Sequence, residues 1–135
     1  MSIEFVVSEL IPASPEIIYF AWLDSGEHTK MTGSPARASN KVGEQFSAWD
    51  GYIQGKNLEL VSSNRIIQTW RTTEFDESDP DSHLEITFEA MENFTRVTIQ
   101  HSNLPSHGMQ YQQGWIEAYF IPMMEHFKEY SISQG

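Results

Sequence analysis

Apolar residues recur at helical spacing in one long stretch of the sequence, from Gln112 to Tyr130. The members of this apolar stripe are Trp115, Ile116, Tyr119, Phe120, Met123, Met124, Phe127 and Tyr130. Their spacing places them on one face of an α-helix, with the intervening polar residues on the other face. Because Pro122 cannot donate a backbone hydrogen bond, we expect a kink there, with the Ala118 carbonyl losing its partner.

Most of the sequence before Ser102 alternates apolar and polar residues, which predicts half-buried β-strands. We predict strands near residues 3–7, 43–49, 52–61, 65–73, 84–90 and 97–101. Asp50-Gly51 predicts a two-residue type I′ turn, since both central residues of that turn need positive φ. Trp49 and Tyr52 would then pair across the strands, with the outer face of the sheet as one place for them. The apolar positions change phase near Gly55, which predicts a β-bulge there.

Two short helices are expected after the first strand. Ser14 followed by Pro15 and Glu16 is typical of a helix start, with the serine as N-cap and the proline at the first helical position. The second short helix is expected to begin at Asp24 or Ser25 and to end at residues 32–35.

The resulting order of elements, one strand, two helices, several strands and a long helix, predicts an α+β fold. An antiparallel sheet with one solvated face must have its other face covered. The predicted helices are the available covers, so we expect a curved antiparallel sheet wrapped around the long C-terminal helix. Such a sheet leaves room for a cavity beside the helix. The chain of 135 residues is expected to form a single domain over residues 1–135.

Composition and charge narrow the classes of function. The formal net charge is −11, from 8 Lys+Arg against 19 Asp+Glu, which argues against binding to nucleic acid or to an anionic membrane. No apolar run approaches the roughly 20 residues that span a bilayer. The sequence has no cysteine and no recognisable signal peptide, and we expect a cytoplasmic protein.

Three segments together are distinctive: Phe46–Gly55 (FSAWDGYIQG), Arg65–Arg71 (RIIQTWR), and Gln113–Trp115 followed by Tyr119-Phe120. In this order they resemble the activator of heat shock protein 90 ATPase homologue family, which belongs to the START-like, or SRPBCC, superfamily. The resemblance covers nearly the whole chain and implies a helix-grip fold. It also implies, as the general use of the superfamily, binding of apolar or aromatic small molecules between sheet and helix. The eukaryotic co-chaperone carries a separate amino-terminal domain, for which we expect no counterpart here.

The candidate ligand-binding residues are the inward-facing aromatic, methionine and polar side chains near the predicted cavity. They are Trp22, Met31, Gln68, Trp70, Phe88, His101, Trp115, Tyr119 and Met123. Core packing is an alternative role for each aromatic residue and methionine. His101 and Gln68 share the parity of buried neighbours, so each either contacts a ligand or satisfies a structural hydrogen bond.

Binding of an apolar or aromatic small molecule is the leading hypothesis for function. The alternative is a stress- or chaperone-associated interaction module that uses the acidic surface. An enzyme of the cyclase or aromatase type ranks last, because it needs two convergent polar groups, for instance His101 and Tyr119. We expect no cofactor and no metal: the histidines lack metal-binding spacing, and the acidic run of residues 74–81 lacks the glycine of a calcium loop. That run is expected to be a solvated turn.

Overall fold

A computed structural model describes the backbone of residues 2–134 and the side chains of residues 2–128, so Tyr130 of the apolar stripe lies outside the described side chains. Its centre is a six-stranded sheet in which every neighbouring pair is antiparallel, in the order β1-β6-β5-β4-β3-β2. The strands are β1 (Ile3–Ile11), β2 (Gln45–Ala48), β3 (Ile53–Val61), β4 (Arg65–Thr72), β5 (Ser82–Met91) and β6 (Phe94–Leu104).

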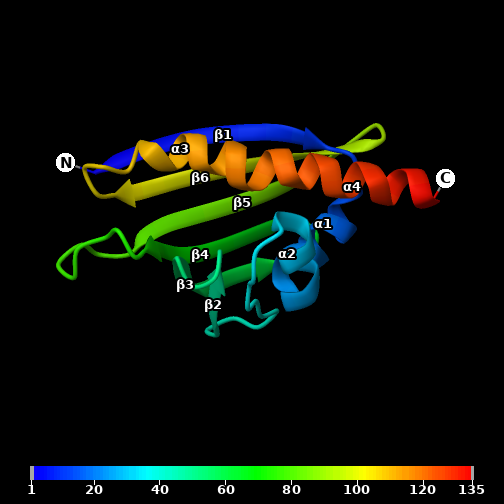
Figure 1. Cartoon of the computed structure of the whole chain (residues 1–135). Helices are drawn as coiled ribbons and strands as arrows, with labels where there is room; N and C mark the ends of the chain where they lie inside the picture. Colours follow the sequence, from blue (N-terminus) through cyan, green and yellow to red (C-terminus); the bar gives the residue numbers. More distant parts are fainter. Residues whose placement is uncertain (1, 135) are drawn as a thin grey trace.

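One face of this sheet carries the helices (Figure 1). The long C-terminal helix runs along β1 and β6 and consists of α3 (Gln110–Trp115), a π-helical turn η1 (Ile116–Phe120) and α4 (Ile121–Gln134). The short helices α1 (Pro15–Leu23) and α2 (Ser25–Thr32) follow β1, and α2 contacts both η1 and α4. The α+β, helix-grip architecture expected from the sequence is therefore confirmed. Among the described residues, no helix is long and apolar enough to cross a bilayer.

Both short helices begin, and the second one ends, at the residues that the sequence indicated. The Ser14 hydroxyl accepts a hydrogen bond from the backbone N–H of Ile17 at 3.3 Å, and Pro15 is the first helical residue. The Asp24 carboxylate caps α2, and Gly33 closes it with φ of 83°. Side-chain caps of this kind satisfy backbone donors that have no partner inside the helix.

Pro122 is accommodated by the π-helical turn that precedes it. The backbone N–H of Ile121 bonds to the carbonyl of Ile116, five residues earlier, so the helical turn just before the proline holds one extra residue. Proline removes the donor that would reach the Ala118 carbonyl. A π-turn is one of the ways in which helices absorb such a lost bond, and these turns often occur at functional sites.

Alternate residues of β4, β5 and β6 point toward the helices and are buried, as their parity predicted. This inner face includes Ile66, Gln68, Trp70, Leu84, Ile86, Phe88, Val97, Ile99 and His101. The stripe of the long helix covers it, with Trp115, Tyr119, Phe120, Met123 and Phe127 buried. The core is therefore a single layer between the sheet and the helices.

The β2–β3 connection differs from the prediction. Asp50 and Gly51 have φ of 57° and 88°, and Tyr52 N–H bonds to the Trp49 carbonyl at 3.1 Å, which confirms the positive φ expected of both central turn residues. However, the ladder ends at the Ala48–Ile53 pair, because Trp49 also has positive φ, 52°. Trp49 and Tyr52 are consequently turn residues, and both lie against the inner side of the sheet rather than on its outer face.

The bulge of β3 lies at Leu58, since the register shifts between Asn57 and Glu59, and not near Gly55 as predicted. Gly55 has a different reason to be glycine. A Cβ atom there would lie 2.0 Å from the Thr69 carbonyl oxygen and 2.5 Å from the Phe46 ring. Only a residue without a side chain allows this close approach.

Candidate functional site

An apolar pocket of about 270 Å³ lies between the β2–β4 half of the sheet and the first turns of the long helix. Its lining residues are Trp49, Tyr52, Ile53, Trp70, Tyr111, Gly114, Trp115, Ala118 and Tyr119. Six of these nine are aromatic and none is charged. A concave apolar site with few polar groups is the usual form of a small-molecule site.

The helix wall of the pocket follows from helical spacing. Tyr111, Trp115 and Tyr119 are four residues apart and therefore lie above one another on the same face. Gly114 and Ala118, also four residues apart, are the small residues beside them. A Cβ at Gly114 would meet no atom within 4 Å, so this glycine leaves open space next to the aromatic row.

The aromatic walls contact one another closely. The ring centroids of Trp115 and Tyr119 are 4.8 Å apart, and those of Trp70 and Trp115 are 5.8 Å apart. Trp70 also meets Tyr111 edge to face at 4.9 Å. Aromatic pairs at about 4.5–7 Å add favourable energy beyond the burial of area, and rigid rings hold a pocket open.

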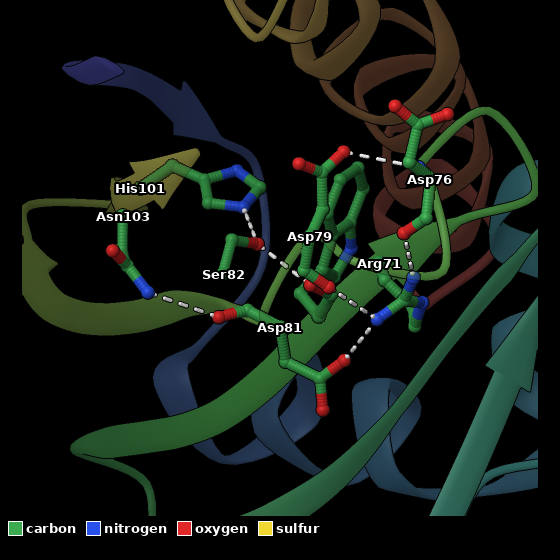
Figure 2. Close-up of polar contacts among 8 residues, drawn as sticks. Arg71, Asp76, Asp79, Asp81, Ser82, His101 and Asn103 are labelled. Atoms are coloured by element: carbon green, nitrogen blue, oxygen red, sulfur yellow. Dashed lines mark hydrogen bonds and ion pairs between the residues drawn. The ribbon is translucent and has the colours of Figure 1, made fainter. Parts of the chain in front are cut away.

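His101 on β6 joins two pocket walls through a directed chain of hydrogen bonds. The indole N–H of Trp115 donates to His101 Nδ1 at 3.0 Å, so Nδ1 carries no proton. The neutral ring is then protonated at Nε2, which donates to the Ser82 hydroxyl at 2.8 Å. Ser82 in turn donates to the Trp70 carbonyl at 2.7 Å. Figure 2 shows His101 and Ser82 facing each other from neighbouring strands.

This chain requires a neutral histidine. Burial, with the nearby His83 as a second cause, lowers the pKa of His101 to about 3. Protonation at Nδ1 would turn the acceptor for Trp115 into a second donor and break that bond. His101 therefore fixes the orientation of Trp115 and of the end of β4, and both of its nitrogens are occupied.

His28 on α2 holds Tyr119 in a similar way. His28 Nδ1–H donates to the Trp22 carbonyl at 2.8 Å, so Nε2 is free to accept the Tyr119 hydroxyl proton, also at 2.8 Å. Burial lowers the pKa of His28, although its bond to the Trp22 carbonyl acts in the opposite direction, and burial raises the pKa of Tyr119. The Trp22 ring stacks on Tyr119 with centroids 5.0 Å apart, behind the pocket wall.

The β4–β5 loop (residues 73–81) is held by Arg71, as Figure 2 shows. The Arg71 guanidinium donates to the carbonyls of Asp76 and Asp79 at 2.9 and 3.1 Å and to the Asp81 carboxylate at 2.9 Å. It also lies over the ring of Phe75, 5.3 Å from the centroid.

This loop is more than the solvated turn that the sequence suggested. Phe75 is buried and lies with its centroid 6.2 Å from that of Trp70 and 6.0 Å from that of Tyr111. Arg71, on the outer face of β4, thereby supports two walls of the pocket through the loop that it binds.

Of the nine candidate ligand-binding residues, three line this pocket: Trp70, Trp115 and Tyr119. The other six are buried in the surrounding core, away from the lining: Trp22, Met31, Gln68, Phe88, His101 and Met123. Among these six, Trp22 and His101 contact the walls directly. Gln68 donates to the Asn57 side chain at 2.8 Å, and Phe88 meets Tyr19 edge to face at 5.9 Å.

Sequence reasoning missed Trp49, Tyr52, Ile53, Tyr111, Gly114 and Ala118 as lining residues. Tyr111 had a usable signal, because it continues the four-residue spacing of Trp115 and Tyr119 by one turn. Gly114 and Ala118 could have been recognised as small residues at helical spacing beside an aromatic row. Trp49 had no such signal, since its place depends on its positive φ.

The two polar groups weighed for catalysis do not converge in the pocket. His101 bonds to Ser82 and Trp115, while the Tyr119 hydroxyl bonds to His28. Each is thus committed to a structural partner. Among the described residues, no group of three or more His, Cys, Asp or Glu side chains could hold a metal ion.

A curved antiparallel sheet around one long helix, with an aromatic pocket between them, defines a START-like domain of the helix-grip class. More particularly, the chain belongs to the family described as Activator of Hsp90 ATPase homolog 1-like protein, which matches residues 12–127.

Relatives and solved structures agree with this assignment. A Dictyostelium discoideum protein named Activator of 90 kDa heat shock protein ATPase homolog is 28% identical over 111 residues, 81% of this chain and 29% of its own length. The crystal structure of an HSP90 activator from Plasmodium falciparum has a TM-score of 0.77 at 26% identity, covering 87% of this chain and 90% of that one. The Aha1 dimer from Colwellia psychrerythraea shares the fold. Its identity to this chain is 21% and its TM-score is 0.71, over 84% of this chain and 88% of that one.

The curated relatives are considerably longer than this chain. It covers 29% of the Dictyostelium discoideum protein and 31% of an uncharacterised Schizosaccharomyces pombe protein that is 25% identical over 107 residues, 77% of this chain. The match therefore concerns one part of those proteins.

Proposed function

We propose that this protein binds a small apolar or aromatic molecule in the pocket between the sheet and the C-terminal helix. The observation that carries the proposal is the lining, in which six aromatic residues and no charged one surround about 270 Å³. Trp115 and Tyr119 are held in place by the hydrogen bonds that they donate to His101 and His28, so the walls are ordered before any ligand arrives. Preorganised walls reduce the entropy cost of binding.

The volume sets the size of the ligand. An engineered cavity of about 150 Å³ binds benzene, so a site of about 270 Å³ suits two fused rings. Ligands of this size gain between about 0.3 and 1.5 kcal/mol per non-hydrogen atom. At roughly 0.5 kcal/mol per atom, a molecule of about ten atoms gains about 5 kcal/mol, a Kd of about 0.2 mM. Binding assays should therefore extend to millimolar concentrations of quinoline and to the solubility limit of naphthalene.

The test of this proposal fills the pocket from the helix side. In an Ala118→Leu variant the added side chain occupies the space beside Gly114, and we expect loss of naphthalene and quinoline binding in titrations followed by tryptophan fluorescence. Glu117→Leu, an exposed position one residue away, is the matched control and should bind as the wild type does. Wild-type protein that binds neither compound, or binding that Ala118→Leu leaves unchanged, would refute the proposal.

The family match supports a second candidate function, interaction with the Hsp90 chaperone. Under this proposal the acidic surface, with a net charge of −11, contributes to a salt-sensitive contact. Because the chain covers less than a third of the curated relatives, we propose binding rather than the full activity that their names describe.

A pull-down with purified Hsp90 at low and at high salt tests the chaperone proposal. We expect retention at low ionic strength and release as the salt concentration rises. No retention at low salt would contradict it. The proposal also includes a cytoplasmic location, which cell fractionation would test.

A further inference from the structure

Trp49 has an indole N–H that is enclosed by protein and has no hydrogen-bond partner. The other buried side-chain atoms without a partner among the described residues are Arg65 Nε and Gln68 Oε1, and neither residue lines the pocket. Trp49 does line it. Buried donors are nearly always paired in native proteins, so an unpaired one at a pocket wall calls for an explanation.

The backbone of Trp49 is also unusual. Its φ of 52° lies in the left-handed region, which bulky side chains rarely adopt. The adjacent turn needs positive φ only at Asp50 and Gly51, its central residues. The turn itself is fixed independently, since Asp50 N–H donates to the Pro35 carbonyl at 2.9 Å. Strained backbone of this kind concentrates at functional sites, where it places a side chain that the regular strand would turn away.

Four of the other five polar side chains of the lining are occupied, and the fifth, the Trp70 indole, has no hydrogen bond among the described residues but is not fully enclosed. The Trp115 indole donates to His101, and the hydroxyls of Tyr119, Tyr111 and Tyr52 contact His28, Thr72 and Glu74 respectively. A ligand that enters the pocket therefore finds these groups already paired, whereas the Trp49 N–H gains its first partner.

The charges around the pocket specify which kind of hydrogen-bond acceptor the ligand carries. The lining has no cation to neutralise an anionic ligand, and the Glu74 carboxylate accepts the Tyr52 hydroxyl at the wall. The overall charge of −11 adds to the repulsion of anions. An indole N–H directed at a ligand also disfavours a cation at that point, since the hydrogen carries partial positive charge.

We propose that Trp49 recognises the ligand by donating its indole N–H to one neutral hydrogen-bond acceptor on a flat, two-ring aromatic molecule. This inference rests on the proposed ligand-binding function and narrows the class of ligand. The half-buried ring turns its N–H from its enclosed position toward the acceptor, and binding removes the unpaired donor.

Three probes on the same two-ring frame separate the possible outcomes at pH 8: naphthalene without an acceptor, quinoline with one neutral acceptor, and N-methylquinolinium with a positive charge. Each is titrated against wild-type protein and against Trp49→Phe, which keeps an aromatic ring but lacks the N–H. We expect the ratio of the naphthalene Kd to the quinoline Kd to fall roughly tenfold in the variant, the loss of one hydrogen bond.

Indole N–H signals in ¹H–¹⁵N NMR spectra give a second measurement that does not depend on the variant's affinity. The signal that Trp49→Phe removes is assigned to Trp49, and in wild-type protein quinoline should shift it strongly downfield while naphthalene moves it less. If the variant does not fold, the same signal can be assigned in wild-type protein by sequential methods.

Failure of the proposed ligand-binding function and failure of the role of Trp49 give different results. If none of the probes binds, both the proposed function and this inference fail. If naphthalene and quinoline bind but the ratio is the same in both proteins, or another indole signal responds to quinoline, the pocket binds ligands and the role of Trp49 is refuted. Tightest binding of N-methylquinolinium would overturn the inference in favour of a site for cations.

Discussion

Acidification should destabilise the wild-type protein more than a His101→Gln variant, because His101 must stay neutral in the folded state. Both ring nitrogens of His101 are occupied, with Nδ1 accepting from Trp115 and Nε2 donating to Ser82. Burial lowers its pKa from 6.5 to about 3. The unfolded chain therefore binds a proton at a higher pH than the folded protein does.

The sign and size of the pH effect on stability follow from this difference in pKa between the folded and unfolded states. The stability that depends on neutral His101 is fully present above pH 6.5 and is lost progressively as the pH falls from 6.5 toward about 3. With these two pKa values, the loss between pH 8 and pH 5 is about 2 kcal/mol, since each pH unit in this window is worth about 1.4 kcal/mol. A glutamine side chain does not titrate, so His101→Gln should lack this part of the loss while retaining that of His28.

Urea unfolding at pH 8 and pH 5, followed by tryptophan fluorescence, measures the effect. The quantity compared is the drop in the free energy of unfolding between the two pH values, which removes the constant cost of the substitution. His126→Gln, on α4 and away from this hydrogen-bond chain, is the control and should behave as the wild type does. An equal drop in wild type and His101→Gln would refute the assignment of His101 as a neutral structural residue.

Three further predictions concern the pocket walls and the strands and loop that support them. Tyr119→Phe removes the donor to His28 Nε2 and should cost about 1–3 kcal/mol in urea unfolding, because a buried acceptor is left without a partner; a cost near zero would contradict this bond. Gly55→Ala places a Cβ 2.0 Å from a backbone oxygen of β4 and should lower the melting temperature sharply. Gly114→Ala meets nothing within 4 Å and should be tolerated or stabilising. Similar melting temperatures for the two variants would count against this geometry. Arg71→Gln removes the donors that hold the β4–β5 loop and should speed limited proteolysis within it, while Arg96→Gln, on the β5–β6 ladder, should not.

The elements of this fold could be read from the sequence because their signals are local. The apolar stripe of the C-terminal helix depends on helical spacing, and the alternation of residues 65–73 and 84–90 depends on the two-residue period of strands. The same parity placed His101 and Gln68 inside, and both are buried. Caps such as Ser14 act within one turn of the helix, so they too were predictable.

The pocket could be predicted only in part. Trp70, Trp115 and Tyr119 were found because they lie on faces that the pattern turns inward. Trp49 and Tyr52 were expected to pair across the strands, with the outer face as one place for them, because a two-residue turn would have kept both in regular strands. The positive φ of Trp49 ended the ladder one pair earlier and turned both rings toward the helix.

The amino-acid sequence by itself therefore determined the class of fold and the inward face of each element, since periodicity needs only neighbouring residues. The tertiary structure alone decided which partners those inward side chains meet. Trp115 with His101 and Tyr119 with His28 are separated by 14 and 91 residues in the chain. Such pairs form only when the sheet curves around the helix, and no local pattern specifies which residues so far apart in the sequence will meet. The same curvature decides where the packing stays open, and so where a ligand can bind.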